Sequence, residues 1–439
     1  MGLFEALGEA AGHLDTTRKF ISGDISFQQA AKRSVAINAV TTGKLFSPCS
    51  AVATSLGTFN KAIDSKALEL CQTITSLIKE VSGRGLDRED IHLAVAVLAA
   101  VQSRVPTPAC IMNPYKAESS PSLANFRHYL KHATAVYGTR KLATFVDPGA
   151  LCFNDGEEAW IRNRTGITGE PITWDYAGGK CPEYYLCVDH ERQEVVLAVR
   201  GTMDLNAIVL DLDCQYYEPE DDVVYHRGID NLARELLGRV KDRIGEMLRK
   251  NPGYRLTLTG HSLGGAVAAE VAISLSEKTT SGAFVTNDKT CQGREIHCYA
   301  IDPAATINPT ASRRYEPLIS SLVHDKDFVP TLSYGLLQDI AAYARYLRDN
   351  RECLVDASLA LHSPEKCRGV LEVFERLSVH PRLVPPGRVY AIERVSGKLR
   401  YGEVQNVANY YPTLRICINM LCDHFPVNIE KNLSQLGRS

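Results

Sequence analysis

The sequence predicts an α/β fold with a central, mostly parallel β-sheet. The first observation is that short β-like runs alternate with amphipathic helical patterns past about residue 138, which is typical of α/β domains. The second is that the chain has 439 residues, 45% hydrophobic and 23% charged, enough to bury a large core. The third is that the first 110 residues have helical spacing and few strand signals, for example from Leu68 to Ile78. We therefore expect a helical N-terminal region at 1–110 and an α/β domain at 111–439.

The elements follow one another in a regular order along the α/β part of the chain. After a Pro/Ser-bearing boundary at Val105–Pro121, apolar residues from Leu123 to Tyr137 share one helix face, which ends at Gly138. Strands are then expected at 184–188, 194–199, 254–259, 296–301, 319–323 and 388–392, with a helix from Ile229 to Leu248. Helical spacing returns between Pro330 and Pro385, which predicts a helical insertion at about 331–385.

Charge and cysteine content exclude several functional classes. The net charge is −2, without a basic cluster interleaved with aromatics, so nucleic-acid binding is not expected. Thirteen cysteines, scattered without C-x-x-C pairs or close histidine partners, indicate reduced thiols and a cytoplasmic setting, not a disulfide framework or a zinc site. The longest apolar run, Ile91–Val101, is too short to cross a membrane, and residues 1–20 lack the pattern of a secretory signal.

The sequence Gly260-His261-Ser262-Leu263-Gly264 lies between the β-like run 254–259 and a helical run of small residues, 266–275. This is the layout of a nucleophile elbow, in which glycines let the helix pack against the strand and leave the serine Oγ exposed. The alternative is an ordinary strand-to-helix turn with a serine near the helix start. Because the pentapeptide alone has low specificity, the other groups of a serine nucleophile's machinery must also be present.

An acid is expected just past a strand, where the active edge of the sheet lies. Asp327 follows the run 319–323 and is our choice; Asp325 is a close competitor, and Asp302, after the run 296–301, is a weaker one. Each could instead be a solvated turn residue.

A histidine base is expected after the acid in the chain. Of the twelve histidines, His362, His380 and His424 fit that order, and we favour His424, which comes after a β-like run and before Pro426. A histidine at such a position is otherwise a surface or core residue.

The oxyanion formed during acyl transfer needs hydrogen-bond donors. One is expected from the backbone N–H of Leu263, the residue after the nucleophile, and the other from the turn after an early strand. The run 194–199 leads into Arg200-Gly201-Thr202, so Thr202 is the second candidate donor, although the segment could be a plain strand-ending turn.

Five separated motifs together resemble the class 3 lipases, and within them the sn-1-specific diacylglycerol lipases. The motifs are Ala198-Val199-Arg200-Gly201-Thr202, His226-Arg227-Gly228, Gly260-His261-Ser262-Leu263-Gly264-Gly265, Lys326-Asp327-Phe328-Val329-Pro330 and Asp423-His424-Phe425-Pro426. The resemblance covers about residues 123–435. It implies an α/β-hydrolase fold, metal- and cofactor-independent hydrolysis of an acylglycerol ester, the triad Ser262, Asp327 and His424, and oxyanion donors Thr202 and Leu263.

The chain departs from that family at three positions. Asp204 and Ala207 stand where members often carry Ser and Asp, although Asp211 fits, and Thr331 stands where Arg is common. An acidic residue such as Asp204 hinders anion stabilisation when it points inward.

The expected reaction converts diacylglycerol to monoacylglycerol and fatty acid at a membrane or lipid-droplet surface. An esterase for small soluble acyl groups and a noncatalytic lipase-like scaffold, which Asp204 favours, are the alternatives. The insertion at 331–385 is lid-like, although a helical subdomain without motion is equally compatible with its pattern. The apolar positions of residues 1–20 share one helix side, which suits either a membrane interface or docking on the protein core.

Overall fold

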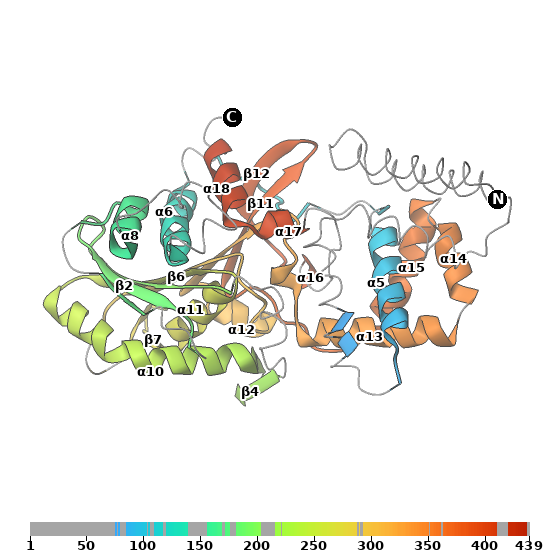
Figure 1. The fold of residues 1–439 in the computed structure, drawn as a ribbon, viewed down its shortest axis with the longest axis horizontal. Coiled ribbons are helices and arrows are strands. Elements are labelled where there is room, and N and C mark those ends of the chain that lie inside the picture. Colours follow the sequence, from blue (N-terminus) through green and yellow to red (C-terminus); the bar gives the residue numbers. More distant parts are fainter. Residues whose placement is uncertain are drawn as a thin grey trace. The chain divides into compact units, whose positions relative to one another are not determined.

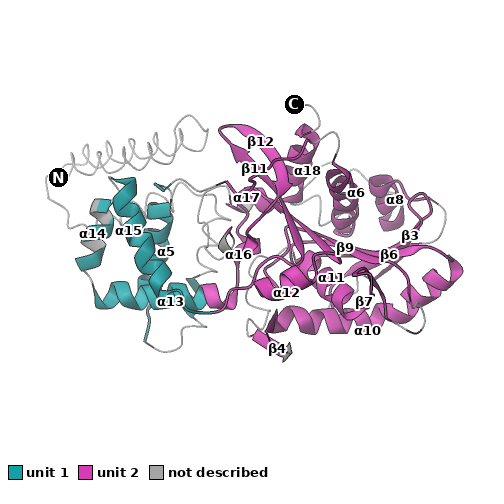
Figure 2. Cartoon of the chain, turned by 180° about the vertical axis from the view of Figure 1, so that it is seen from behind, with its two compact units in different colours: residues 1–107, 337–380, 416–418 teal, residues 108–336, 381–415, 419–439 magenta. Residues whose placement is uncertain are grey.

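A computed structural model describes most of the chain from residue 75 onward. The described residues are 75–76, 78–79, 85–102, 104–105, 109–116, 120–138, 156–168, 172–175, 181–202, 216–220, 222–287, 289, 293–350, 352–360, 363–410 and 420–436. The chain divides into two compact units (Figure 2): residues 1–107, 337–380 and 416–418 form unit 1, and the remainder forms unit 2. Residues 1–20, whose apolar side suits a membrane interface or docking on the core, lie outside the described residues, as does most of the helical pattern from Leu68 to Ile78.

Unit 2 contains an eight-stranded mixed sheet (Figure 1). In spatial order the strands are β1 (Thr173–Asp175), β2 (Tyr184–Asp189), β3 (Glu194–Val199), β6 (Arg255–His261), β9 (Ile296–Ile301), β10 (Ile319–His324), β11 (Arg388–Val395) and β12 (Lys398–Glu403). The central pairs from β3 to β11 are parallel, and the outer pairs at each edge are antiparallel. The expected mostly parallel sheet is confirmed.

The register of the central strands brings their carboxyl ends to one edge of the sheet. Val199 of β3 is opposite Gly260 of β6, and His261 of β6 is opposite Ile301 of β9. Leu322 of β10 is also opposite Ile301. The segments that follow these strands therefore start close together, as in other open α/β sheets that bind ligands at this edge.

Helices cover both faces of this sheet (Figure 1). The helices in the described part of unit 2 are α6 (Pro121–Ala135), α8 (Glu157–Thr165), α10 (Arg227–Lys250), α11 (Leu263–Ser274), α12 (Pro309–Arg314), η3 (Val329–Thr331), α16 (Val407–Tyr410), α17 (Met420–His424) and α18 (Pro426–Gln435). Two small hairpins, β4–β5 (Tyr216–Glu220, Val223–His226) and β7–β8 (Ser276–Lys278, Phe284–Thr286), lie outside the main sheet. Helices α6 and α8 lie on one face and α10 and α11 on the other, with α6 and α11 both contacting β6.

Helix α6 shows how local sequence and packing agree. The Ser120 hydroxyl accepts a hydrogen bond from the backbone N–H of Leu123, and Pro121 occupies the first turn, where its missing N–H costs nothing. The helix buries Phe126 and Leu130 in a core cluster shared with strands of the sheet. The predicted apolar face is confirmed for Leu123, Phe126, Leu130 and Ala133, whereas Tyr137 lies past the end of the helix at Ala135 and packs in a different core cluster.

Unit 1 is helical in its described part. It contains α5 (Arg88–Gln102), α14 (Glu352–Ala360), α15 (Pro364–Leu377) and all but the first turn of α13 (Tyr334–Asp349). The run Ile91–Val101 lies in α5, which packs against α14 and α15. Two of the insertion's helices, α13 and α15, include the periodic residues Leu336–Leu347 and Val370–Leu377 that predicted them.

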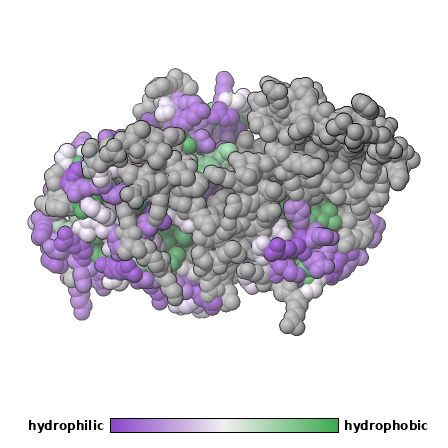
Figure 3. All heavy atoms as spheres, in the orientation of Figure 1, coloured by the Kyte–Doolittle hydropathy of each residue, from purple (hydrophilic) through white to green (hydrophobic). Residues whose placement is uncertain are grey.

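Among the described residues, no helix combines the length and apolarity needed to span a bilayer. The described surface visible in Figure 3 is mostly hydrophilic, with small hydrophobic patches. The large hydrophobic side chains exposed among the described residues are Met112, Tyr115, Trp174, Val379 and Val427.

Candidate active site

Ser262 lies in a sharp turn between β6 and α11. Its backbone has φ 59° and ψ −129°, a conformation that is costly for a residue with a side chain. A Cβ at Gly260 would collide with the backbone of Gly264, and one at Gly264 would collide with the carbonyl oxygen of Val199. The glycines thus permit the close approach of helix and strand that the elbow pattern predicted.

His424 connects Ser262 to Asp327. The Ser262 Oγ–H donates to His424 Nε2 at 2.8 Å, and His424 Nδ1–H donates to Asp327 Oδ2 at 2.7 Å. The backbone N–H of Val329 donates to Asp327 Oδ1 at 3.0 Å and fixes the other side of the carboxylate. The structure therefore brings together the three residues predicted as nucleophile, base and acid, in the geometry that general-base activation of a serine needs.

Burial determines the charge of the base. His424 is 6% exposed, and this desolvation lowers the pKa of its imidazole to about 3. The ring is therefore neutral near neutral pH, and its Nε2 can accept the serine proton.

Neither of the two competing acids, Asp302 and Asp325, accepts the hydrogen bond from His424 Nδ1, which goes to Asp327. Asp325 has positive φ, 39°, and its Oδ1 lies 3.9 Å from Lys326 Nζ. Asp302 is buried, and its Oδ1 accepts the backbone N–H of His324 at 2.7 Å. Burial and the neighbouring Asp327 raise the pKa of Asp302 well above its ordinary value. Burial also raises the pKa of Asp327, but this carboxylate accepts hydrogen bonds from His424 and Val329, so we assign the charge to Asp327 and the proton to Asp302.

Two further residues, which the sequence analysis missed, hold the backbone of His424. The His261 Nε2–H donates to the carbonyl oxygen of His424 at 2.9 Å, while Tyr137 Oη donates to His261 Nδ1 at 2.9 Å. Burial lowers the pKa of His261 well below its ordinary value, so this ring is neutral too. Only the position of His261 inside the elbow could have indicated such a role; nothing in the sequence near Tyr137 does.

A second pair of contacts holds the residue before His424. The His324 Nδ1–H donates to the carbonyl oxygen of Asp423 at 2.7 Å, and the backbone N–H of Lys326 donates to Asp423 Oδ2 at 3.2 Å. The β-like run expected before His424 is only partly described. Its last residues form the short helix α17, and Pro426 begins α18. Short apolar runs do not distinguish helix from strand, which explains that difference.

The turn after β3 lies against the serine. A Cβ at Gly201 would lie 3.2 Å from Ser262 Cβ and would collide with the carbonyl oxygen of His261. Thr202, the predicted second oxyanion donor, directly follows this glycine, and Leu263 begins α11, where backbone N–H groups have no partner within the helix. Both predicted donors thus belong to segments that meet at Ser262.

Several predicted positions fall outside this arrangement. His380 belongs to unit 1, where its Nδ1 hydrogen-bonds Asp339 Oδ1 at 2.6 Å. His362, Asp204, Ala207 and Asp211 lie outside the described residues. Thr331 caps its own turn, donating its hydroxyl proton to the carbonyl oxygen of Phe328 at 2.6 Å.

One expectation about the elbow is wrong. Its serine was expected to be exposed, yet Ser262 has no exposed surface. We therefore expect that the groups covering Oγ move when a substrate binds.

The sheet topology, the strained serine turn and the Ser262–His424–Asp327 contacts define an α/β-hydrolase. Residues 196–336 match the family model described as Lipase (class 3), which confirms the resemblance seen in the motifs.

Known relatives carry related names. The chain is 28% identical over 258 residues to diacylglycerol lipase-beta of Mus musculus, covering 52% of this chain and 36% of that protein. It is 30% identical over 164 residues to secreted mono- and diacylglycerol lipase A of Penicillium cyclopium, covering 36% of this chain and 52% of that protein. The chain thus spans about a third to a half of the length of these relatives. The solved structure of lipase II from Rhizopus niveus has 15% identity and a TM-score of 0.42, covering 69% of this chain and 92% of the other.

Proposed function

We propose that this chain is a serine hydrolase that cleaves a carboxylic ester of an acylglycerol, converting diacylglycerol to monoacylglycerol and fatty acid. The observation that carries the proposal is the hydrogen-bonded chain from Ser262 through His424 to Asp327 at the carboxyl edge of the sheet. The names of the relatives, lipases of mono- and diacylglycerol, support the substrate class.

Acylation begins when His424 Nε2 takes the proton of Ser262 Oγ as that oxygen attacks the ester carbonyl carbon. The carbonyl oxygen becomes an oxyanion, which the N–H of Leu263 and the donors of Thr202 stabilise. Asp327 remains ionised and stabilises the imidazolium. When the intermediate collapses, the ester C–O bond breaks, and His424 Nε2–H gives its proton to the leaving glyceride alcohol.

Deacylation repeats these steps with water as the nucleophile. His424 Nε2 takes a proton from water, whose oxygen attacks the acyl carbon on Ser262. The second oxyanion is held by the same donors, and its collapse breaks the bond to Ser262 Oγ. The proton returns to Oγ, and the fatty acid leaves.

The test compares emulsified dioleoylglycerol with a short-chain nitrophenyl ester, using Ser262→Ala as the control. We expect fatty acid release from the diacylglycerol and loss of release in the variant. Activity confined to the soluble ester would favour a small-molecule esterase, and no activity on either would favour a noncatalytic scaffold. Equal activity of Ser262→Ala would contradict the assignment of the nucleophile.

We propose that the protein works in the cytoplasm at the surface of a membrane or lipid droplet. The proposal rests on the thiol-rich composition and the lipid nature of the proposed substrate. We expect the protein in the soluble and peripheral-membrane fractions of cells. Co-sedimentation with liposomes, unchanged after deletion of residues 1–20, would rule out that segment as the membrane contact.

A further inference from the structure

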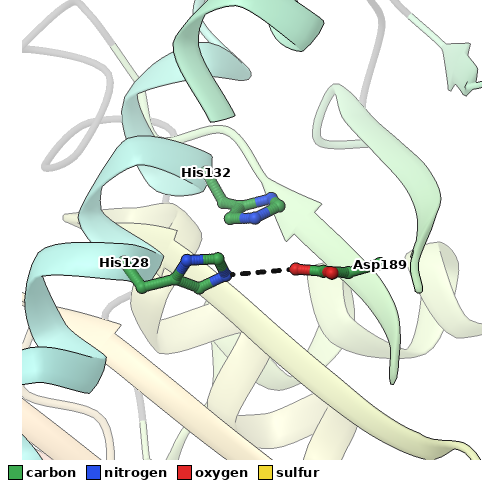
Figure 4. Close-up of side chains that lie close together, drawn as sticks. All are labelled: His128, His132 and Asp189. Atoms are coloured by element: carbon green, nitrogen blue, oxygen red, sulfur yellow. Dashed lines mark ion pairs between the residues drawn. The ribbon is translucent and has the colours of Figure 1, made fainter. Parts of the chain in front are cut away.

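Two histidines and an aspartate outside the candidate active site gather at one place in unit 2 (Figure 4). His128 and His132 lie one turn apart on α6, and Asp189 is the last residue of β2. One ligand atom from each of the three, an imidazole nitrogen or a carboxylate oxygen, lies within 4.8 Å of the others. Histidines at positions i and i+4 of a helix present both rings on one face, which is a common way to bind a transition metal.

The bonding of His132 leaves one nitrogen free to act as a ligand. Its Nδ1 lies 2.8 Å from Tyr185 Oη, and the Tyr185 hydroxyl donates its own proton to the carbonyl oxygen of His132 at 3.4 Å. With the hydroxyl proton on that carbonyl, we assign the ring proton to His132 Nδ1, so that Nε2 of the neutral ring has a bare lone pair.

That lone pair is buried and unsatisfied. His132 has no exposed surface, and its Nε2 has no hydrogen-bond partner among the described residues. A buried acceptor without a partner is unfavourable because it has lost its hydrogen bonds to water, so a purely structural role leaves this ring unexplained. A histidine that binds a metal through Nε2 typically donates its Nδ1–H to an outer partner, and Tyr185 Oη is such a partner for His132.

His128 and Asp189 also leave hydrogen-bonding atoms at this place without a good partner among the described residues. His128 Nε2 lies 3.5 Å from Asp189 Oδ2, which is long for a hydrogen bond, and it too has no such partner among the described residues. Asp189 Oδ1 accepts the backbone N–H of Arg192 at 3.0 Å, which fixes the carboxylate and leaves Oδ2 toward the histidine. Two ligands of a tetrahedral zinc ion with bonds of about 2.0–2.1 Å are roughly 3.3–3.4 Å apart, close to this separation.

Charged neighbours surround the three groups. Glu194 Oε1 lies 3.9 Å from His128 Nε2, but this carboxylate already accepts hydrogen bonds from Tyr129 and Arg255. Arg192 Nε lies 3.4 Å from Glu194 Oε1, so each of these arginines is paired with Glu194. Glu194 therefore acts as an outer carboxylate that lowers the local positive charge, and Asp189 supplies the negative ligand.

We propose that His128, His132 and Asp189 bind a divalent transition-metal ion of the zinc type, through His128 Nε2, His132 Nε2 and Asp189 Oδ2. The side chain of His128 is 21% exposed, which gives the ion an entry path and water a place as the fourth ligand. Bound there, the ion ties α6 to the end of β2. It would stabilise unit 2 without taking part in ester hydrolysis, so the proposal does not depend on the proposed function.

The test measures metal binding by the full chain after removal of metals with a chelator. Titration with Zn²⁺ should show one tight site and a rise in Tm that grows with Zn²⁺ concentration. Replacement by Co²⁺ should give d–d absorption of a low-coordinate site with nitrogen and oxygen ligands, without the charge-transfer band of a thiolate. The Co²⁺ spectrum thereby separates this site from the protein's cysteines.

Variants assign the site. His128→Ala and the nearly isosteric Asp189→Asn should each weaken Zn²⁺ binding at least tenfold and abolish the rise in Tm. His190→Ala, an exposed histidine next to Asp189, is the matched control and should bind as the wild type does. A second group, His261, Asp302 and His424, is also close enough to hold a metal. His424→Ala removes a ligand of that second group only, so it should bind Zn²⁺ as the wild type does if the ion is at His128, His132 and Asp189.

Three results would overturn the proposal. They are the absence of a stoichiometric site in the wild type, wild-type binding by folded Asp189→Asn, and loss of binding only in His424→Ala.

Discussion

The neighbouring carboxyl groups of Asp302 and Asp327 have different protonation states and different roles at the candidate site. Both are buried beside His424, where two negative charges would repel each other strongly. The Nδ1–H of His424 donates to Asp327, while Asp302 accepts a backbone N–H from His324. A neutral Asp302 next to a charged Asp327 satisfies all of these donors with only one buried charge.

This division predicts different effects of two chemically identical substitutions. Asp327→Asn should lower kcat by about 10³–10⁴-fold, because an amide favours the wrong tautomer of His424 and cannot stabilise the imidazolium. Asp302→Asn should lower kcat much less, since an amide resembles a protonated carboxyl and still accepts the N–H of His324. The measurement is hydrolysis of a soluble ester by each variant, with Asp325→Asn as a control that should behave like the wild type.

A larger loss in Asp302→Asn than in Asp327→Asn would reverse the assignment of acid and neutral partner. Only folded protein hydrolyses the ester, so unfolding curves of both variants show whether a lower rate reflects slower chemistry or a smaller folded fraction.

At the scale of elements, residue patterns in the sequence predicted the helices and strands whose bounds depend on local spacing. Strand β3 has the bounds of its apolar run because all of its residues are buried in the middle of the sheet, where each must be apolar or hydrogen-bonded. Strand β9 also has the bounds of its run, although His297 and Tyr299 are only partly buried. Helix α17 was missed because five residues are too few to show a period.

The supporting contacts of the site could not be predicted in the same way. Tyr137 and His261 are 124 positions apart in the chain, and their hydrogen bond exists only once α6 packs on the sheet. The choice between Asp302 and Asp327 likewise depends on which carboxylate faces the imidazole, since both directly follow strands. Sequence spacing places residues at the carboxyl edge of the sheet, whereas tertiary packing decides their partners.

The packing of α11 against β3 and β6 predicts a contrast between two glycines. Gly264→Ala puts a methyl group onto the carbonyl oxygen of Val199 and the backbone of Arg200, so it should destabilise the fold by at least about 1–3 kcal/mol and disturb the serine turn. Gly238 lies in the interior of α10 with open space around its Cα. Gly238→Ala should therefore stabilise the fold by up to about 1 kcal/mol through helix propensity.

Urea unfolding of the two variants measures this contrast, and ester hydrolysis reports on the turn. Equal stability of Gly264→Ala and the wild type would show that helix and strand can separate without cost, contrary to the contact seen here.

At the scale of the whole molecule, the insertion is joined to unit 2 at two neighbouring points. The Tyr216 hydroxyl accepts the backbone N–H of Gly335 at 2.6 Å and donates to the carbonyl oxygen of Pro381 at 2.6 Å. The chain therefore leaves unit 2 and returns to it at nearly the same place, so residues 337–380 can be replaced by a short Gly/Ser linker without stretching the sheet domain.

This excision distinguishes the two interpretations of the insertion, a lid and a packed helical subdomain. Because Ser262 is fully buried, we expect wild-type hydrolysis to rise sharply when the ester substrate passes from monomers to an emulsion, as a lipid surface favours an open form. Without residues 337–380, the rise at the emulsion threshold should disappear, and hydrolysis of a soluble ester should become faster. The excised chain carrying Ser262→Ala is the control, and circular dichroism verifies its fold. A folded excised chain that keeps the wild-type threshold would show that the insertion is a packed helical subdomain, and that other groups cover the serine.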